Sequence, residues 1–210
     1  SIEKKFITKL KNRMEKLRVG NPLDKSIDIG AIVAPVQLKK IDKLVKQGKK
    51  DGAHLWQPSW SCPTEGLFYP PTLFTNVTPA SLIAQVEIFG PVLPVKTYDE
   101  LDEAINYVNG KERPLGLYYF GDDKVEQNLV VDNTTSGGVT LNDVISHITM
   151  EDLPFGGIGP SGMGSYHGYD GFKEFSHAKA TYRQSKINLN KLAGFVPPYK
   201  KNKEHDLTGS

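Results

Sequence analysis

Residues 153–164 read LPFGGIGPSGMG, and GIGPSG within them matches the G-x-G-x-x-G pattern of dinucleotide-binding loops. Such a loop binds a pyrophosphate when a buried strand leads into its first glycine and a helix begins at its last. Here the polar stretch HITMEDLP precedes the pattern, Pro160 lies inside it, and more glycines follow where the helix should begin. The context therefore argues against a phosphate loop. Glycines this closely spaced instead predict left-handed turns and close approach of the backbone to another surface.

The single cysteine, Cys62, is the candidate nucleophile by residue type. It lies in WSCPTEG beside a proline, with no histidine near it in sequence and no helix beginning after it to lower its pKa. We therefore expect a packed or solvent-facing thiol without a catalytic role. The histidines do not fall at ligand spacings, so no metal site is predicted. One cysteine also fits a reducing, cytoplasmic compartment.

Composition narrows the class of partner. Hydrophobic residues make up 38% and charged residues 24%, as in ordinary soluble globular proteins. The net charge of +2 is too small to favour nucleic acid or a membrane surface, and no aromatic and basic motif indicates RNA binding. No apolar run approaches the roughly 18 residues that a membrane span needs. We expect no nucleic-acid partner and no membrane partner.

Two helices are expected in the first 50 residues. Apolar residues recur every three or four positions from Ile2 to Leu17, and Gly20 and Pro22 should stop that helix. A second helix is predicted over residues 36–50, with Leu38, Ile41, Leu44 and Val45 facing inward. Prolines then bound two short extended segments, HLWQP and PPTLFTNV.

Strands and helices alternate in the segment that follows. Strands are predicted in EIFGPVLPVKTY, LGLYYF and GGVTLND. Helices are predicted in DELDEAINYVNG, with Asp99 as its N-cap, and in KVEQNLVVDN. This alternation predicts an α/β fold, with a mainly parallel sheet covered by helices.

The order of these motifs resembles the C-terminal half of an aldehyde dehydrogenase. EIFGPVLPV, LGLYYF, SGGVTLNDV and LPFGGIGPSGMGSYHGYDGFKEFSHAKA follow one another as in that family, most like the branch of coniferyl-aldehyde and class 3, fatty-aldehyde-like enzymes. The resemblance runs from the first helix to about residue 200. It implies that residues 1–177 belong to the catalytic domain and that residues 178–210 form an oligomerisation strand and tail.

The resemblance also implies a reaction, the NAD- or NADP-dependent oxidation of an aldehyde to a carboxylate. A cysteine thiolate attacks the carbonyl, and a glutamate activates water to hydrolyse the thioester. The resemblance places that cysteine, that glutamate, the oxyanion asparagine and the cofactor-phosphate loop upstream of residue 1. We therefore expect a fragment of a full enzyme that is inactive alone, with no catalytic residue within it. The alternative is a free, non-catalytic interaction module or subunit.

Two residues of EIFGP are implied to bind the cofactor. Glu87 matches the residue that accepts hydrogen bonds from the hydroxyls of the nicotinamide ribose, a task that suits a carboxylate because it accepts two at once. Phe89 matches the aromatic residue beside the nicotinamide. Without the resemblance, Glu87 would be interpreted as a surface carboxylate and Phe89 as a core residue.

The substrate side of the site is implied by later motifs. Phe155 matches an aromatic residue on the wall of the aldehyde tunnel, and Ile145 matches an apolar tunnel residue; plain core packing is the alternative for both. His147 is placed at the substrate entrance, and His167 is expected to brace the glycine loop. A β-prone run at Ala180–Tyr182 matches the strand that pairs with a partner subunit, so a homodimer or larger homo-oligomer is expected.

Overall fold

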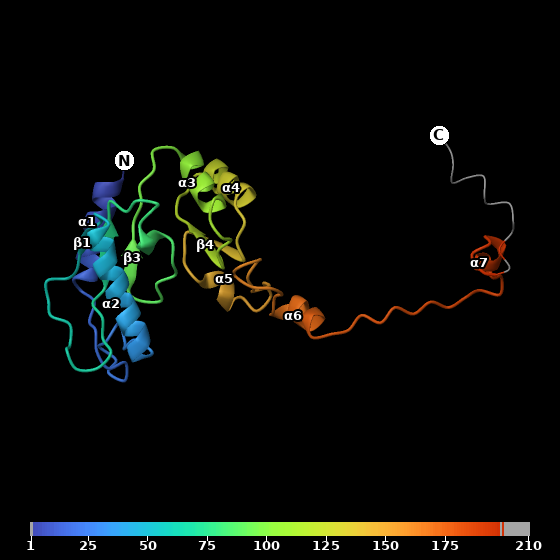
Figure 1. The fold of residues 1–210 in the computed structure, drawn as a ribbon, viewed down its shortest axis with the longest axis horizontal. Coiled ribbons are helices and arrows are strands. Elements are labelled where there is room, and N and C mark those ends of the chain that lie inside the picture. The colour runs from blue at the N-terminus through green and yellow to red at the C-terminus, as the bar shows by residue number, and fades with distance from the viewer. Residues whose placement is uncertain (1, 198, 200–210) are drawn as a thin grey trace. The chain divides into compact units, whose positions relative to one another are not determined.

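The computed structural model describes residues 2–197 and 199 and divides into two compact units, one ending at Gly110 and the other beginning at Lys111 (Figure 1). The first unit contains α1 (Glu3–Met14), α2 (Pro35–Lys50), β1 (His54–Trp56), β2 (Thr72–Thr75), the 3-10 helix η1 (Leu82–Ala84), β3 (Val92–Pro94) and α3 (Leu101–Asn109). The second contains β4 (Gly116–Tyr119), α4 (Lys124–Asn133), β5 (Gly138–Leu141), α5 (Ser146–Thr149), α6 (Gly168–Glu174) and α7 (Leu189–Leu192). Both units combine helices with strands, which confirms the predicted α/β class.

The sheet of the first unit has the strand order β1-β2-β3. β1 runs antiparallel to β2, with Leu55 opposite Phe74, whereas β2 and β3 are parallel, with Leu73 opposite Leu93. A parallel pair needs a crossover connection, and the segment through η1 provides one between β2 and β3. The antiparallel strands β1 and β2 are joined by residues 57–71, which contain neither helix nor strand.

The core of the first unit lies between α2 and this sheet. Ile41 and Phe74 are fully buried and pack together with Leu44, Val45 and Ile88. The apolar spacing of α2 therefore buries the face that the sequence predicts, except that Leu38 is only half-buried. Burying side chains of this size contributes about 2 kcal/mol each, so this cluster is the main stabilising contact of the unit.

α1 differs from its prediction. It ends at Met14 rather than near Leu17, because the Lys16 N–H donates to the Arg13 carbonyl and the Leu17 N–H to the Met14 carbonyl, so the last turn is tightened to i→i−3 bonds. Its apolar stripe is also largely uncovered by the described residues: Ile2 is 81% exposed, and of the whole helix only Met14 is buried.

The second unit is built on a strand–helix–strand motif. β4 and β5 are parallel, with Gly116 opposite Gly138, and α4 connects them. Asp123 caps α4 by accepting hydrogen bonds from the backbone N–H groups of Val125 and Glu126. The C-terminal ends of the two strands are tied together, because the Gly121 N–H donates to Asn142 Oδ1 at 2.8 Å.

Two details of the predicted sheet and helices are wrong. The sequence placed the strand in EIFGPVLPVKTY in one sheet with β4 and β5, whereas β3 pairs with β2 and the described strands form two sheets. Asp99 does not cap α3: Glu100 holds the N-cap position, and the Glu103 carboxylate reaches back towards the Asp99 N–H at 3.4 Å.

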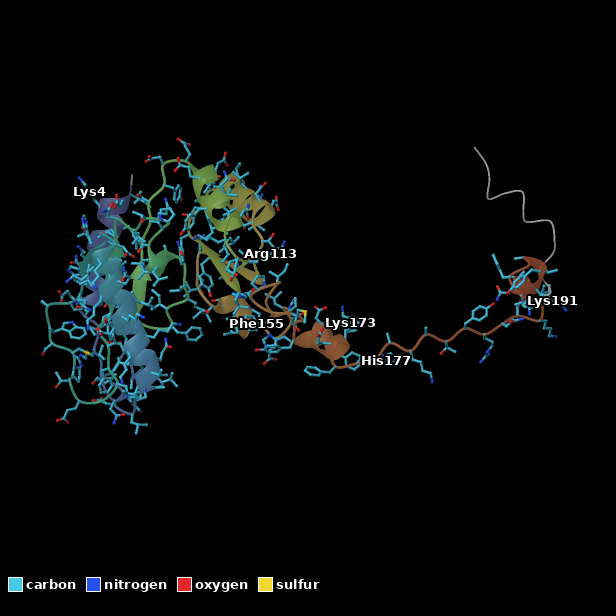
Figure 2. All side chains as sticks on the ribbon, in the orientation of Figure 1. Lys4, Arg113, Phe155, Lys173, His177 and Lys191 are labelled. Carbon is cyan, nitrogen blue, oxygen red and sulfur yellow. The ribbon has the colours of Figure 1, made fainter. Side chains whose placement is uncertain are left out.

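The chain after α6 has little regular structure among its described residues. Residues 176–185 form neither helix nor strand, and their side chains are exposed. Figure 2 shows this stretch between the labelled His177 and Lys191. The β-prone run at Ala180–Tyr182 thus has no strand partner within the described chain, and the last part of the predicted tail, residues 200–210, lies outside the described residues.

Candidate functional site

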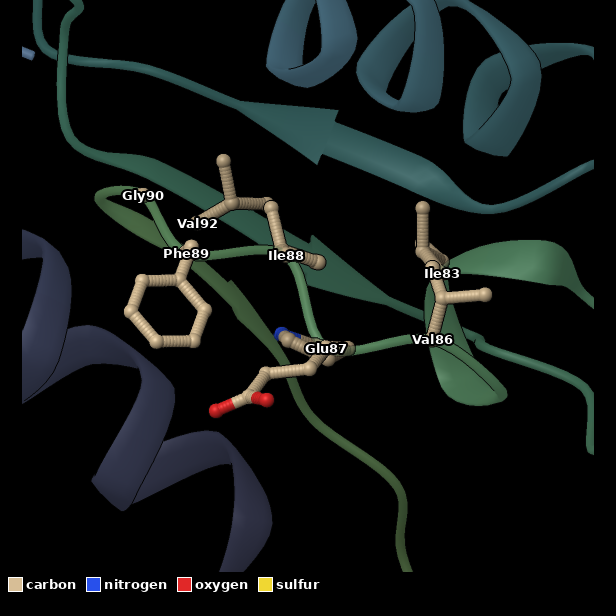
Figure 3. A pocket seen from close by; sticks show the side chains of 8 residues that line it. Ile83, Val86, Glu87, Ile88, Phe89, Gly90 and Val92 are labelled. Carbon is tan, nitrogen blue, oxygen red and sulfur yellow. The ribbon is translucent and has the colours of Figure 1, made fainter. Parts of the chain in front are cut away.

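The EIFGP loop, residues 87–91, lies between η1 and β3 at the edge of the first sheet. It borders an open depression of about 350 Å³ that Glu87, Phe89 and Gly90 line together with apolar side chains of the same region. Figure 3 shows Ile88 turned towards α2, while the carboxylate of Glu87 and the ring of Phe89 project from the opposite side of the loop. The structure thus brings the two predicted cofactor residues to one surface.

Both side chains are available to a ligand. Phe89 is 72% exposed, which is unusual for a large aromatic ring in an ordered loop. The Glu87 side chain is exposed and makes no hydrogen bond to another described residue. An exposed carboxylate beside an exposed ring suits a ligand that offers hydroxyl donors next to a flat apolar group.

Phe89 has a left-handed backbone, with φ of 53°. A residue other than glycine pays about 1–3 kcal/mol for that conformation, and such residues concentrate at functional sites. Pro91 follows Gly90 and cannot donate a hydrogen bond to a neighbouring strand. These features explain why the predicted strand begins only at Val92.

A cluster of aromatic rings forms the candidate substrate region of the second unit. The His147 and Phe155 ring centroids are 6.0 Å apart, and Phe155 meets Tyr166 edge-on at 5.6 Å. Tyr118 lies 6.1 Å from His147, and His167 stacks against Phe155 at 6.4 Å. The structure therefore brings Phe155 and His147 together in one cluster, from segments on either side of the loop that links α5 to the glycines.

His147 is buried rather than open to solvent in this unit. It is 7% exposed, and its Nδ1 lies 2.7 Å from Thr140 Oγ1 on β5. Its Nε2 has no hydrogen-bond partner among the described residues and sits over the backbone of Gly138. The ring is thus anchored against β5, and its predicted place at a substrate entrance stays a prediction.

Ile145 precedes α5 and has a φ of 67°. A β-branched residue with a left-handed backbone is a genuine outlier, because the Cβ branches clash with the chain. Its side chain is 54% exposed, so core packing within the described chain does not explain it. Phe155, by contrast, is half-buried in the ring cluster. The two predicted tunnel residues therefore differ in how much surface they offer.

The glycine loop is a tight double turn. Phe155 and Tyr166 exchange backbone hydrogen bonds of 2.9 and 3.0 Å, and Gly159 pairs with Gly162 inside that bridge. A Cβ on Gly156 would collide with the carbonyl oxygen of Gly164. The backbone of the loop is therefore packed closely on itself, as the glycine spacing predicts. Helix α6 begins only at Gly168, after the last turn of the loop.

Cys62 is the free thiol of the first unit and is half-buried. Burial raises the pKa of the Cys62 thiol above its ordinary value, which disfavours the thiolate that a nucleophile needs. Within residues 2–197 and 199, no three metal-binding side chains gather at one place. The helices of that same part of the chain are all too short or too polar to cross a membrane.

Sequence reasoning missed two residues on α2. The Gln37 side-chain amide donates to the carbonyls of Ile88 and Phe89, and Lys40 Nζ lies 3.4 Å from the carbonyl of Glu87. The only signal in the sequence is a polar glutamine one turn before the buried Ile41, on the apolar face of the helix.

Known proteins are similar to this chain along most of its length. The model described as "Aldehyde dehydrogenase family" matches residues 1–181. A probable coniferyl aldehyde dehydrogenase of Caulobacter vibrioides is 58% identical over 130 residues, covering 62% of this chain and 27% of the relative. The dimeric NADP-preferring aldehyde dehydrogenase of Rattus norvegicus is 36% identical over 198 residues, covering 94% of this chain and 42% of the relative.

Solved structures agree with the sequence relatives. The NAD-dependent aldehyde dehydrogenase of Sinorhizobium meliloti superposes with a TM-score of 0.79 at 32% identity, over 84% of this chain and 35% of that one. The indole-3-acetaldehyde dehydrogenase AldA of P. syringae, a mutant in complex with NAD+ and IAA, gives 0.80 at 30% identity, over 86% and 36%. The chain thus spans less than half the length of these relatives. With its family match over residues 1–181, this chain belongs to the aldehyde dehydrogenase family.

Proposed function

We propose that this chain is the part of an NAD(P)-dependent aldehyde dehydrogenase that holds the nicotinamide ribose and one wall of the aldehyde pocket. The observation that carries the proposal is the EIFGP loop, which presents Glu87 and Phe89 together at an open depression within the family match. The catalytic domain ends near residue 177 in this proposal. The end of α6 at Glu174 and the irregular chain after it support that boundary.

The residues fit the cofactor chemistry. The unpaired, exposed carboxylate of Glu87 would accept hydrogen bonds from the two ribose hydroxyls, and the exposed Phe89 ring would limit rotation of the flat nicotinamide. NAD or NADP would supply the hydride acceptor when bound. This chain would orient the nicotinamide and its ribose, because Glu87 and Phe89 lie two positions apart in the same loop.

The proposed substrate is an aldehyde such as coniferyl aldehyde. The relatives in Caulobacter vibrioides and in Pseudomonas sp. that are named for that activity are 58% and 54% identical to this chain. Phe155 and the rings around it offer aromatic surface, and the exposed Ile145 offers an apolar contact. Other aromatic or aliphatic aldehydes fit the same surface chemistry, and the assay below separates them.

The nucleophile is proposed to come from another part of the enzyme. Cys62 has a raised pKa, and no described histidine interacts with it to accept its proton. We also propose a reducing compartment such as the cytoplasm, because this thiol is free.

We expect the isolated chain to leave NAD and NADP unreduced with every aldehyde. Co-production with the matching N-terminal part of the Caulobacter vibrioides relative should give aldehyde-dependent reduction, because that part would supply the proposed nucleophile. The absorbance of the reduced cofactor measures both, with coniferyl aldehyde, benzaldehyde and hexanal compared. Cys62→Ser in the assembled enzyme is the control and should keep the activity. Reduction by the isolated chain, or a folded but inactive assembly, would contradict the proposal.

We expect the chain to form a homodimer or larger oligomer in solution. The aromatic side chains of α6 and the stretch after it are uncovered by the described residues: Tyr169 is 71% exposed and Phe175 is 88% exposed. Burying them against a second copy would stabilise the assembly by roughly 25 cal/mol for each Å² of apolar surface. Light scattering at low micromolar concentration measures the mass. A value near the 23.3 kDa of one chain that does not change with concentration would show this expectation to be wrong.

A further inference from the structure

Three consecutive carbonyl groups of the EIFGP loop are bonded by side chains of one helix. The Gln37 Nε2 amide donates to the carbonyl of Ile88 at 2.8 Å and to that of Phe89 at 3.1 Å. One turn further along α2, Lys40 Nζ lies 3.4 Å from the carbonyl of Glu87. The partners are about fifty positions apart in the sequence, so these contacts are tertiary and not part of a local turn.

The same face of α2 also holds the loop by packing. A Cβ on Gly90 would lie 2.9 Å from Cγ1 of Ile41, so the glycine lets the backbone rest directly on the helix. The Ile88 side chain is 7% exposed and belongs to the same core cluster as Ile41. Positions 37, 40 and 41 lie on one helical face. The loop is therefore fastened to α2 from Glu87 to Gly90.

This fastening opposes the strain at Phe89. The left-handed backbone of Phe89 is unfavourable for a residue other than glycine. The hydrogen bonds from Gln37 offset that strain, and losing the donor also leaves the part-buried Ile88 carbonyl unsatisfied. A loop without the donor is thus free to relax towards an ordinary backbone, which would turn the Phe89 ring and the Glu87 carboxylate.

We propose that Gln37 is a positioning residue of the dehydrogenase, which acts through the EIFGP loop by holding Phe89 left-handed. The inference rests on the proposed function of Glu87 and Phe89. An amide suits this position, since its two N–H groups can each donate to one of the two carbonyl oxygens. Lys40 cannot replace it, because its contact is longer and reaches only the carbonyl of Glu87.

The chain offers a matched control. The Gln85 side-chain amide also donates to two consecutive carbonyls, those of Pro79 at 3.1 Å and Ala80 at 3.3 Å. Replacing either glutamine with Met removes the donors and keeps a side chain of similar length. Gln37→Glu is a second variant that also removes the donors. It should fold, because a carboxylate in the first turn of a helix is stabilising. The two positions thus test the same chemistry at different loops.

The first measurement is NMR of the backbone carbonyl carbons in this chain. Gln37→Met and Gln37→Glu should shift the carbonyl signals of Ile88 and Phe89 and leave those of Leu73 and Phe74 in β2 unchanged. The signals of the EIFGP loop should also be averaged between two backbone conformations. Gln85→Met should shift Pro79 and Ala80 instead. Unchanged Ile88 and Phe89 signals in both Gln37 variants would overturn the proposal.

The second measurement is the kinetics of the assembled enzyme. Gln37→Met should lower the turnover number about tenfold, with a much smaller change in the Michaelis constant for the cofactor, because a misplaced ring costs rate more than affinity. Gln85→Met should stay within about twofold of the starting enzyme by the same reasoning. A raised Michaelis constant with unchanged turnover would overturn the positioning role. A third outcome separates the two proposals. If the NMR shifts appear but neither Gln37→Met nor Glu87→Gln changes the kinetics, the proposed function of Glu87 is wrong, while the contact from α2 stands.

Discussion

In the assembled dehydrogenase, Glu87→Gln is expected to lower the turnover number by about 100-fold, which is the scale of the loss when a reacting atom is misplaced by about 1 Å. The amide keeps the size of the side chain but accepts through one oxygen only, so one ribose hydroxyl loses its acceptor. Affinity for the cofactor should fall much less, because the ribose contact is one among many. Steady-state kinetics with varied cofactor concentration separates the two effects.

Glu65→Gln is the matched control for that experiment. Glu65 is an exposed carboxylate of the same unit, outside the depression beside the EIFGP loop. Its replacement should leave turnover and the Michaelis constant unchanged. If Glu87→Gln raises the Michaelis constant for the cofactor and leaves turnover intact, Glu87 serves binding alone and the orientation argument fails.

Gly156→Ala is expected to destabilise the chain by about 3 kcal/mol, the upper part of the usual range for overpacking. The new methyl group would collide with the carbonyl oxygen of Gly164, and neither backbone segment can rotate away as a side chain could. Urea unfolding followed by circular dichroism measures the free energy of unfolding. The loss should appear as a lower midpoint.

Gly159→Ala in the same loop separates crowding from backbone strain. Gly159 has a φ of 61°, but a Cβ there would meet nothing nearer than Arg113 at 3.7 Å. Its replacement should cost only the left-handed backbone, about 1 kcal/mol. Equal losses for the two variants would mean that crowding by the Gly164 carbonyl does not control the loop.

Periodicity and turn chemistry were enough to place most elements. The predicted helix over residues 36–50 begins at Pro35, and KVEQNLVVDN coincides with α4, because apolar spacing and a capping aspartate are local signals. The end of α1 was not predicted, because the apolar spacing continues to Leu17 while the helix ends at Met14. The split into two sheets is likewise a matter of long-range pairing, which no local pattern encodes.

In the candidate site, too, local motifs were predictable and long-range contacts were not. Glu87 and Phe89 were found from the EIFGP motif, and their roles stay predictions that the experiments above test. The left-handed backbones of Phe89 and Ile145 contradict the usual preference of those residue types, so no propensity rule could predict them. Gln37 was missed because its partners are carbonyl groups, which every residue possesses and which leave no mark in a sequence.

The position of His147 has a consequence for engineering the second unit. A Cβ on Gly138 would lie 2.8 Å from Nε2 of His147, so the imidazole occupies the volume that any side chain at 138 would need. The side chains at positions 138 and 147 are therefore sterically coupled: a larger residue fits at one position only if the residue at the other is smaller. In a double-mutant cycle, Gly138→Ala with His147→Ala should be less damaging than the sum of the two single changes. A library that randomises His147 alone will therefore sample only the side chains that fit beside Gly138.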